Sequence, residues 1–185
     1  MTEDELEKEC TGTMTVLQTP RLLLREFSFA DGDALARILC DPETMRYYPA
    51  RYDRAAVERW IERNRRRYQD DGVGLWAIER IQTRELIGDC GIVCQQVEGE
   101  PFYEIGYHLR SDCWRQGFAT EAATACRDWG FRHLKTERLV SLIRPGNLAS
   151  RLVAGRIGMT VSNEVSWRGL PHLLYAIERA NSRLL

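Results

Sequence analysis

The sequence lacks the features that would place it in a membrane or around a metal ion. None of its apolar runs approaches the ~20 residues that a membrane-spanning helix requires. Its acidic start, MTEDELEKEC, differs from a signal peptide, which is basic and then apolar. The six cysteines are scattered, with no CxxC pair and no nearby histidine doublet to suggest zinc. These absences predict a cytoplasmic protein with free thiols, no metal and no membrane partner.

An excess of charge is missing as well. The chain has 26 basic and 27 acidic side chains and a formal net charge of -1, so it is not biased as a whole toward nucleic acid. Any anion-binding site must therefore be local. The most basic stretch, RNRRRY at residues 63–68, has acidic neighbours and no interleaved aromatic residues, which is typical of a solvated helix face. Nucleic-acid binding through this stretch is a third-ranked hypothesis, and no nucleic-acid partner is expected.

Hydrophobic periodicity predicts an α/β fold. Strands are expected at residues 21–27, 75–80, 85–94, 102–109, 138–143, 159–167 and 172–178, and helices at 29–39, 53–68, 117–134 and 147–157. Residues 1–18 lack periodicity and are expected to form a loosely ordered extension, followed by one domain over 19–185. Strands that lead, with helices inserted between the later ones, favour one mixed, mostly antiparallel sheet with helices on both faces.

The stretch CWRQGFATEA, residues 113–122, has the character of an anion site. A helix that begins near Gly117 offers unpaired backbone N–H groups and the positive end of its dipole, and both attract phosphate. Gly117 has no Cβ to keep a ligand away, Arg115 adds a positive charge, and Thr120 adds a hydroxyl group. A lone glycine at a helix start is also common without any ligand, so its meaning depends on context.

The context consists of three motifs: TPRLLLREF near the start, EIGYHL leading into WRQGFATEA, and NLASRLVAGRIGM near the end. In order and spacing they resemble the GNAT superfamily of N-acetyltransferases, in the branch similar to the RimJ/RimL ribosomal-protein acetyltransferases, over residues 17–178. The resemblance implies a GNAT-like fold, acetyl-CoA as the acyl donor and an amine acceptor. The general family signature has Gln or Arg where this chain has Trp114, whereas Gly117 and Ala119 match it. The substitution puts in doubt which side chain flanks the phosphates.

The resemblance also implies the contacts to acetyl-CoA. The diphosphate is expected on Arg115, Gln116, Gly117, Phe118, Ala119 and Thr120. The strand segment Tyr107, His108 and Leu109 is expected to diverge from the next parallel strand and bond to the pantetheine arm, with an amide near Leu109 polarising the thioester carbonyl. Asn147 is expected to contact the cofactor, and Ser150 to donate a hydrogen bond to the departing thiolate. Both residues would otherwise simply cap a helix.

The reaction requires a proton acceptor, because a lysine amine titrates near ~10.4 and an N-terminal amine near ~8. Glu104, on the strand that would flank the thioester, is the candidate base, directly or through water. Its alternative role is to pair with a strand neighbour or to orient the substrate. His108 as a base and Cys113 as a covalent nucleophile are disfavoured, since Cys113 has no partner base nearby. Tyr47 and Tyr48 are candidates for the acceptor pocket.

The leading hypothesis is therefore an N-acetyltransferase that moves an acetyl group from acetyl-CoA to a primary amine by direct attack in a ternary complex. The acceptor is a protein N-terminus or a small molecule, and the protein is a monomer or a homodimer. The alternative is a non-catalytic acyl-CoA-binding sensor of the same fold. The two differ in whether a product forms.

Overall fold

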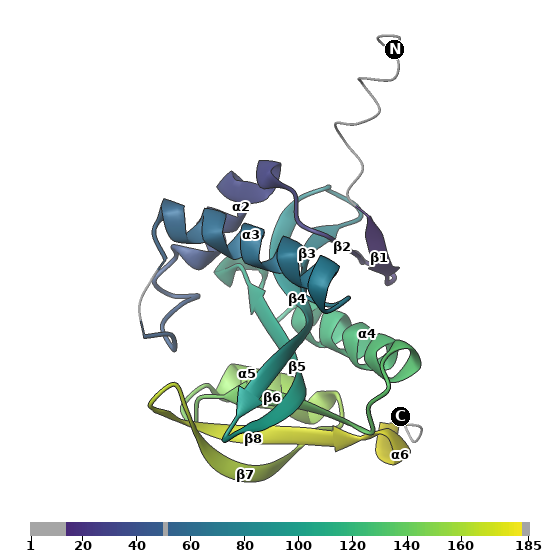
Figure 1. Ribbon diagram of the computed structural model, residues 1–185. Helices are drawn as coiled ribbons and strands as arrows, with labels where there is room; N and C mark the ends of the chain where they lie inside the picture. Colours follow the sequence, from purple (N-terminus) through teal and green to yellow (C-terminus); the bar gives the residue numbers. More distant parts are fainter. Residues whose placement is uncertain (1–13, 50–51, 183–185) are drawn as a thin grey trace.

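The computed structural model describes residues 14–49 and 52–182 (Figure 1). In this part of the chain one sheet runs in the order β1-β2-β3-β4-β5-β6-β8-β7. The strands are β1 (Thr15–Gln18), β2 (Leu22–Arg25), β3 (Leu75–Arg80), β4 (Leu86–Val97), β5 (Glu100–Leu109), β6 (Arg138–Ile143), β7 (Thr160–Trp167) and β8 (Leu170–Glu178). Strands β5 and β6 are parallel, and the other neighbours are antiparallel. The predicted mixed, mostly antiparallel sheet is confirmed.

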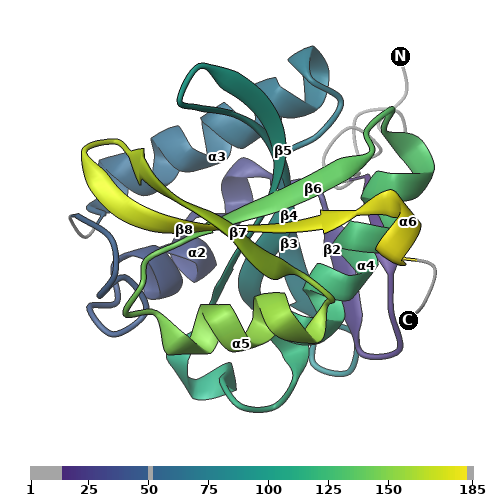
Figure 2. The ribbon, with the colours of Figure 1, turned by 90° about the horizontal axis from the view of Figure 1, so that it is seen from below.

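Helices cover both faces of this sheet. They are α2 (Gly32–Leu39), α3 (Arg54–Asp70), α4 (Phe118–His133), α5 (Leu148–Arg156) and the short α6 (Arg179–Ser182), with 3-10 turns at Phe29–Asp31 and Ser111–Cys113. Figure 2 shows α3 and α5 on opposite sides of the crossing strands. One apolar cluster lies beneath α4 and α5, and a second joins α2 and α3 to the other face.

Strand β3 shows how both faces are filled. Its side chains alternate, as the pleat of a strand requires. Trp76 and Ile78 join the cluster beneath α4, whereas Leu75 and Ala77 join the cluster beneath α2 and α3. All four side chains are buried. A continuous apolar run is therefore what a strand covered on both faces needs.

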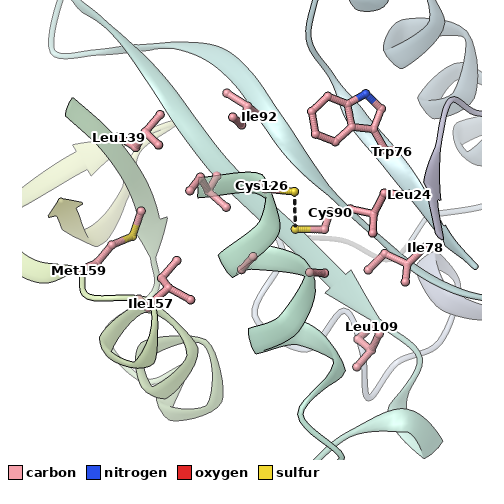
Figure 3. Packing of buried hydrophobic residues seen from close by; sticks show 14 of the residues in the cluster. Leu24, Trp76, Ile78, Cys90, Ile92, Leu109, Cys126, Leu139, Ile157 and Met159 are labelled. Carbon is pink, nitrogen blue, oxygen red and sulfur yellow. Dashed lines mark hydrogen bonds between the residues drawn. The ribbon is translucent and has the colours of Figure 1, made fainter. Parts of the chain in front are cut away.

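Helix α4 lies close to the sheet because its inner face carries small residues. Ala122, Ala123 and Cys126 are fully buried, and a Cβ added at Gly130 would lie 2.6 Å from Ile92 Cδ1 of β4. Figure 3 shows Cys126 facing Cys90 on the sheet, with the two sulfur atoms 3.5 Å apart. The stripe of small residues thus fixes the distance at which the start of α4 stands above the strands.

Residues 15–18 were predicted to belong to a loosely ordered extension, and this part of the prediction is wrong. Residues 15–18 form β1, which pairs with β2, while residues 1–13 lie outside the described residues. A four-residue strand with exposed ends has too little pattern to be seen in the sequence, because its partner supplies its hydrogen bonds. The strands β4 and β5 also run further than predicted, to a two-residue turn at Glu98 and Gly99. Both turn residues have positive φ, which suits a tight hairpin.

Candidate active site

Strands β5 and β6 separate shortly after they meet. Their only paired position in the described sheet is Glu104 with Val140, and just beyond it the Ser141 hydroxyl donates to the Ile105 carbonyl at 2.7 Å. From there the strands diverge, as Figure 1 shows. A parallel pair that stops after one position leaves backbone groups without a strand partner at the centre of the sheet. The predicted divergence along residues 107–109 is therefore present.

The direction of each backbone N–H decides which residues face this gap. Arg110 donates to Ile87 of β4 at 2.9 Å, so the N–H of Leu109, one residue earlier, points the opposite way, toward β6. The N–H of Tyr107 points the same way as that of Leu109. His108 corrects the expectation, because its N–H donates to Asp89 Oδ1 at 3.2 Å, away from the gap. Tyr107 and Leu109 thus offer amides to the gap, and His108 does not.

Glu104 lies where the two strands part. Its Oε1 accepts a hydrogen bond from the Leu142 N–H of β6 at 3.3 Å, and its side chain lines a cavity. Burial raises the pKa of Glu104 above its ordinary value, although hydrogen bonds from Gln95 and Leu142 oppose the shift. A carboxyl group with a raised pKa is a better proton acceptor than an ordinary one.

A cavity of about 350 Å³ opens beside Glu104. Tyr47 and Tyr48, from the segment between α2 and α3, line it as predicted, and Trp167 and Leu170 line it from the β7–β8 turn. Residues 50 and 51 of the first segment lie outside the described residues. The volume is in the range of small-molecule sites. Because the cavity contains Glu104 and also borders the gap, a ligand within it would meet anything bound between β5 and β6.

Buried polar atoms with unused hydrogen-bonding capacity lie in one wall of the cavity, on His108 and Trp60, and behind that wall, on Asp89. His108 Nδ1 lies 2.7 Å from Asp89 Oδ1, and the rings of Tyr48 and Trp60 lie 5.0 and 5.3 Å from the imidazole. Among the described residues no group bonds to His108 Nε2, Asp89 Oδ2 or Trp60 Nε1. Since a carboxylate only accepts, Nδ1 carries the proton in the contact with Asp89, and Nε2 is left without a partner among the described residues.

Helix α5 begins beside the same cavity. Asn147 is its N-cap, and Asn147 Oδ1 accepts from the Ser150 N–H at 3.2 Å, so the capping role considered for Asn147 is present. The Tyr107 hydroxyl donates to the Ser150 carbonyl at 2.9 Å. The Ser150 side chain interacts with the Tyr107 hydroxyl, and both Asn147 and Ser150 line the cavity. The Ser150 hydroxyl therefore lies on the cavity side, next to Tyr107.

The turn at residues 115–120 stands apart from the cavity. Gly117 has φ 84° and Arg115 has φ 61°, and α4 starts immediately afterwards. Glu121 is the first residue to bond back, to the Gly117 carbonyl at 3.0 Å, and no described group accepts from the backbone N–H groups of residues 115–120. Six free amides and the positive end of a helix dipole are features that attract an anion.

The side chains of this turn divide into structural and free ones. Gln116 Nε2 donates to the Asp112 carbonyl, and Phe118 is buried in the core. For Phe118 only the backbone is available to a ligand, whereas the Gln116 side chain is exposed and keeps its Oε1 free. Trp114, which departs from the family signature, donates from Nε1 to the Leu109 carbonyl at 2.7 Å and ties the turn to the end of β5. Arg115, by contrast, is exposed.

A cluster of hydrogen bonds joins this turn to β2. Glu121 of α4 accepts from Thr19 Oγ1 at 2.6 Å, from Arg21 N at 3.0 Å and from Arg21 Nε at 2.6 Å. Arg21 also donates to the Gln116 carbonyl at 3.0 Å. The motifs TPRLLLREF and WRQGFATEA, about 100 residues apart, thus hold each other in place. Their contact holds the start of α4 against β2.

This cluster predicts a pH-dependent stability. Partial burial acts to raise the pKa of Glu121, but hydrogen bonds from Thr19 and Arg21 outweigh it and lower the pKa. A lowered folded-state pKa gives stability that is present above the unfolded value and lost as the pH falls through the folded value. We expect Glu121→Gln to lower the free energy of unfolding by about 1–3 kcal/mol at pH 7, measured by urea unfolding. On going from pH 7 to pH 3.5, the variant should lose less of its free energy of unfolding than wild type does. The exposed Glu58→Gln should match wild type, and an equal acid slope for Glu121→Gln would contradict the prediction.

Comparison with known proteins decides the family. Residues 21–160 match a protein-family model described as an acetyltransferase (GNAT) domain. The chain belongs to the GNAT acetyltransferase family. It is 39% identical to the uncharacterized protein YkkB of Bacillus subtilis over 162 residues, covering 87% of this chain and 94% of YkkB. It is 30% identical to the uncharacterized N-acetyltransferase YnaD of the same species, covering 77% and 81% of the two chains.

Solved structures agree with this GNAT assignment. An acetyltransferase from Agrobacterium tumefaciens has a TM-score of 0.77 and 30% identity, covering 91% of this chain and 97% of its own. The ribosomal L7/L12 α-N-protein acetyltransferase RimL, solved in complex with coenzyme A, has a TM-score of 0.72 and 17% identity, covering 89% and 98%. At that identity RimL shows the shared fold alone.

Two buried polar residues of this candidate site were not predicted from the sequence. Asp89 lies in the run LIGDCGIV, and Ser141 lies in RLVSLI. Both are fully or nearly buried. A lone polar residue inside an apolar strand is a signal, because a buried polar group needs a partner. Within the described ranges no three metal-ligating side chains gather, and no helix there is long and apolar enough to cross a bilayer.

Proposed function

We propose that this GNAT protein transfers an acetyl group from acetyl-CoA to a primary amine by direct attack in a ternary complex. The observation that carries the proposal is the opening between β5 and β6. It begins at Glu104, passes the inward amides of Tyr107 and Leu109, and leads toward the free amides of residues 115–120. An acyl donor with a diphosphate at one end and a thioester at the other fits such a path. The coenzyme A complex of RimL, which has this fold, supports it.

The chain's own groups suggest how each end would be held. The backbone N–H groups of residues 115–120, with Arg115 and the Thr120 hydroxyl, would bind the diphosphate. The gap-facing amides of Tyr107 and Leu109 would bind the pantetheine arm, and Asn147 would line its far end. The Leu109 amide would stabilise negative charge that develops on the thioester oxygen. Acetyl-CoA supplies the activated acyl group, and its thiolate leaves as the amide bond forms.

Glu104 would take a proton from the ammonium group of the acceptor, directly or through a water molecule, so that the neutral amine can attack the thioester. Its carboxylate lines the cavity where an amine would lie, and its raised pKa suits a proton acceptor. His108 Nε2 lies on the same cavity and could hold a second donor group of the acceptor. The acceptor is a primary amine, on a protein N-terminus or a small molecule.

Ser150 would stabilise the departing thiolate. We expect Ser150→Ala to lower kcat by about 10- to 100-fold, because a hydrogen bond to a charged group is worth about 1.5–3 kcal/mol. The Asn147 cap uses the backbone of Ser150 and should survive the change. Thiol release would give kcat, and calorimetry would give the affinity for coenzyme A. An unchanged kcat would leave Ser150 with the capping role only.

A panel of amines distinguishes the enzyme from a sensor. Purified protein would be incubated with acetyl-CoA and either peptides with free N-termini or small amines, and free thiol and acetylated product would be measured. The proposal expects product with at least one class of amine. A protein that is stabilised thermally by coenzyme A but forms no product with any amine would instead be the non-catalytic sensor.

A further inference from the structure

The arginine-rich helix α3 uses its charges in two different ways. Most of its arginines bond to described neighbours: Arg54 to Asp33, Arg59 to Asp53, Arg65 to the Phe27 carbonyl and Arg66 to Glu62. Arg63 and Arg67 form no ion pair with any described carboxylate, and they are the two that line the cavity. The basic run RNRRRY therefore contains arginines of two kinds. Those without an ion pair, Arg63 and Arg67, lie one helical turn apart on the same face of α3.

Local contacts hold these two side chains at the cavity. The Arg63 guanidinium lies 4.8 Å from the centre of the Trp60 ring, and Trp60 is itself part of the cavity wall. Arg67 is partly buried; burial and the charge of Arg63 lower the pKa of Arg67, while the charges of Asp71 and Glu104 act to raise it. Arg63 is exposed. Two like charges one helical turn apart, with no described carboxylate in ion-pair contact with either, favour an anion that joins them.

The opposite side of the cavity is also basic. Arg168, in the β7–β8 turn, lies 4.3 Å from the centre of the Trp167 ring, and Arg144 donates to the Pro171 carbonyl at 2.7 Å. Both line the cavity, and Glu104 is the one carboxylate among its described lining residues. Four guanidinium groups therefore face one carboxylate, in a chain whose formal net charge is -1. The positive potential is a property of this site and not of the whole protein.

From this arrangement we infer that the acceptor is a small amine that also carries an anionic group, a carboxylate or a phosphate, bound by Arg63 and Arg67. The inference rests on the proposed acetyl transfer and names its substrate class. A guanidinium group binds either anion with two parallel hydrogen bonds. With the anion at the arginines, the amine of the same molecule would reach toward Glu104. A cavity of about 350 Å³ suits a small molecule.

Matched pairs of amines test the inference. Phosphoethanolamine would be compared with ethanolamine, and β-alanine with its amide, by calorimetry on the complex with coenzyme A and by kcat/KM with acetyl-CoA. We expect the charged member of at least one pair to be favoured by about 10-fold or more, and less so at high salt. The pair that shows the preference identifies phosphate or carboxylate as the anion.

Variants of α3 locate the effect. Arg63→Gln and Arg67→Gln should each reduce the preference by several-fold, and the double variant should bring it to within about 2-fold. Arg66→Gln is the matched control, since Arg66 lies on the same helix, pairs with Glu62 and is outside the cavity. Far-ultraviolet circular dichroism and melting temperatures would show that all variants fold.

The outcomes separate this inference from the proposed function. Equal affinity for charged and neutral members, no binding of either anion up to about 10 mM, or a preference that survives the double variant would overturn the inference. Acetylation of neutral amines in those cases would leave the proposed function standing. Anion binding without acetyl transfer to any amine would contradict the proposed function and leave the anion site at Arg63 and Arg67 standing. Salt-sensitive binding of a homopolymeric RNA that the double variant abolishes would also overturn it, since the arginines would then serve nucleic acid.

Discussion

Replacing Glu104 with glutamine is expected to lower kcat/KM for acetyl transfer by about 10²- to 10⁴-fold, with the affinity for coenzyme A unchanged within about 3-fold. Glutamine keeps the size of the side chain and can still accept from the Leu142 N–H. It cannot take a proton from an ammonium group. Steady-state kinetics with an amine identified in the panel, together with calorimetry of coenzyme A, provide the two values.

The pH profile distinguishes a base from a merely structural carboxylate. Because burial raises the pKa of Glu104, wild-type kcat/KM should rise with pH through a value above ~4.5 as the carboxyl group ionises. An acceptor whose own pKa lies well away from that region keeps the two titrations apart. Glu104→Gln should lack this rise, whereas Glu100→Gln, at the exposed start of the same strand, should retain it. If kcat/KM of Glu104→Gln rose with pH as fully as that of wild type, another group would be the base that takes the proton from the acceptor.

Replacing Gly117 with valine is expected to weaken coenzyme A binding by at least about 10-fold. Gly117 has φ 84°, a conformation that costs a residue with a Cβ about 1–2 kcal/mol, and more if it is β-branched. The added Cβ would lie 3.3 Å from Arg21 Nη2 and would stand where the diphosphate must approach the amides. The turn would shift, and the free N–H groups of residues 115–120 would be displaced.

Gly72→Val is the matched control for strain. Gly72 also has positive φ, at 69°, and a Cβ there would meet nothing within 4 Å. Both variants should lower the melting temperature by similar amounts, but only Gly117→Val should weaken coenzyme A binding in calorimetry. Equal affinities for the two variants, or wild-type affinity for Gly117→Val, would show that the diphosphate does not lie on this turn.

The fold was predictable where pattern and turn residues agree. Strands β3 and β6 have the predicted bounds, because each is a short apolar run between turn signals. The helix predicted to begin at residue 53 is α3, and Asp53 is its N-cap and accepts from Ala56 N. Strand β1 was missed because its strand state comes from pairing with β2, and the single predicted helix at 29–39 begins instead with a 3-10 turn. Contacts with other parts of the chain decide whether so short a strand forms and where a helix begins.

The sequence was enough to name the residues of the candidate site, but not to say where their backbone amides and side chains point. Glu104, Leu109, Ser150 and the turn near Gly117 could be named because their motifs occur in order along the chain. That the His108 amide faces Asp89 depends on the β4–β5 register, which no local pattern contains. The sequence likewise does not show that Arg65 and Arg66 bond to neighbours while Arg63 and Arg67 line the cavity. That difference depends on which carboxylates and carbonyls the fold brings near each arginine.

A crystal structure of the protein with coenzyme A tests the central claim most directly. The account predicts the diphosphate on the amides of residues 115–120, the pantetheine arm bonded to Tyr107 and Leu109 between β5 and β6, and the sulfur atom beside Glu104 and Ser150. Coenzyme A bound elsewhere, or no bound coenzyme A in crystals soaked at saturating concentration with that face open to solvent, would contradict it.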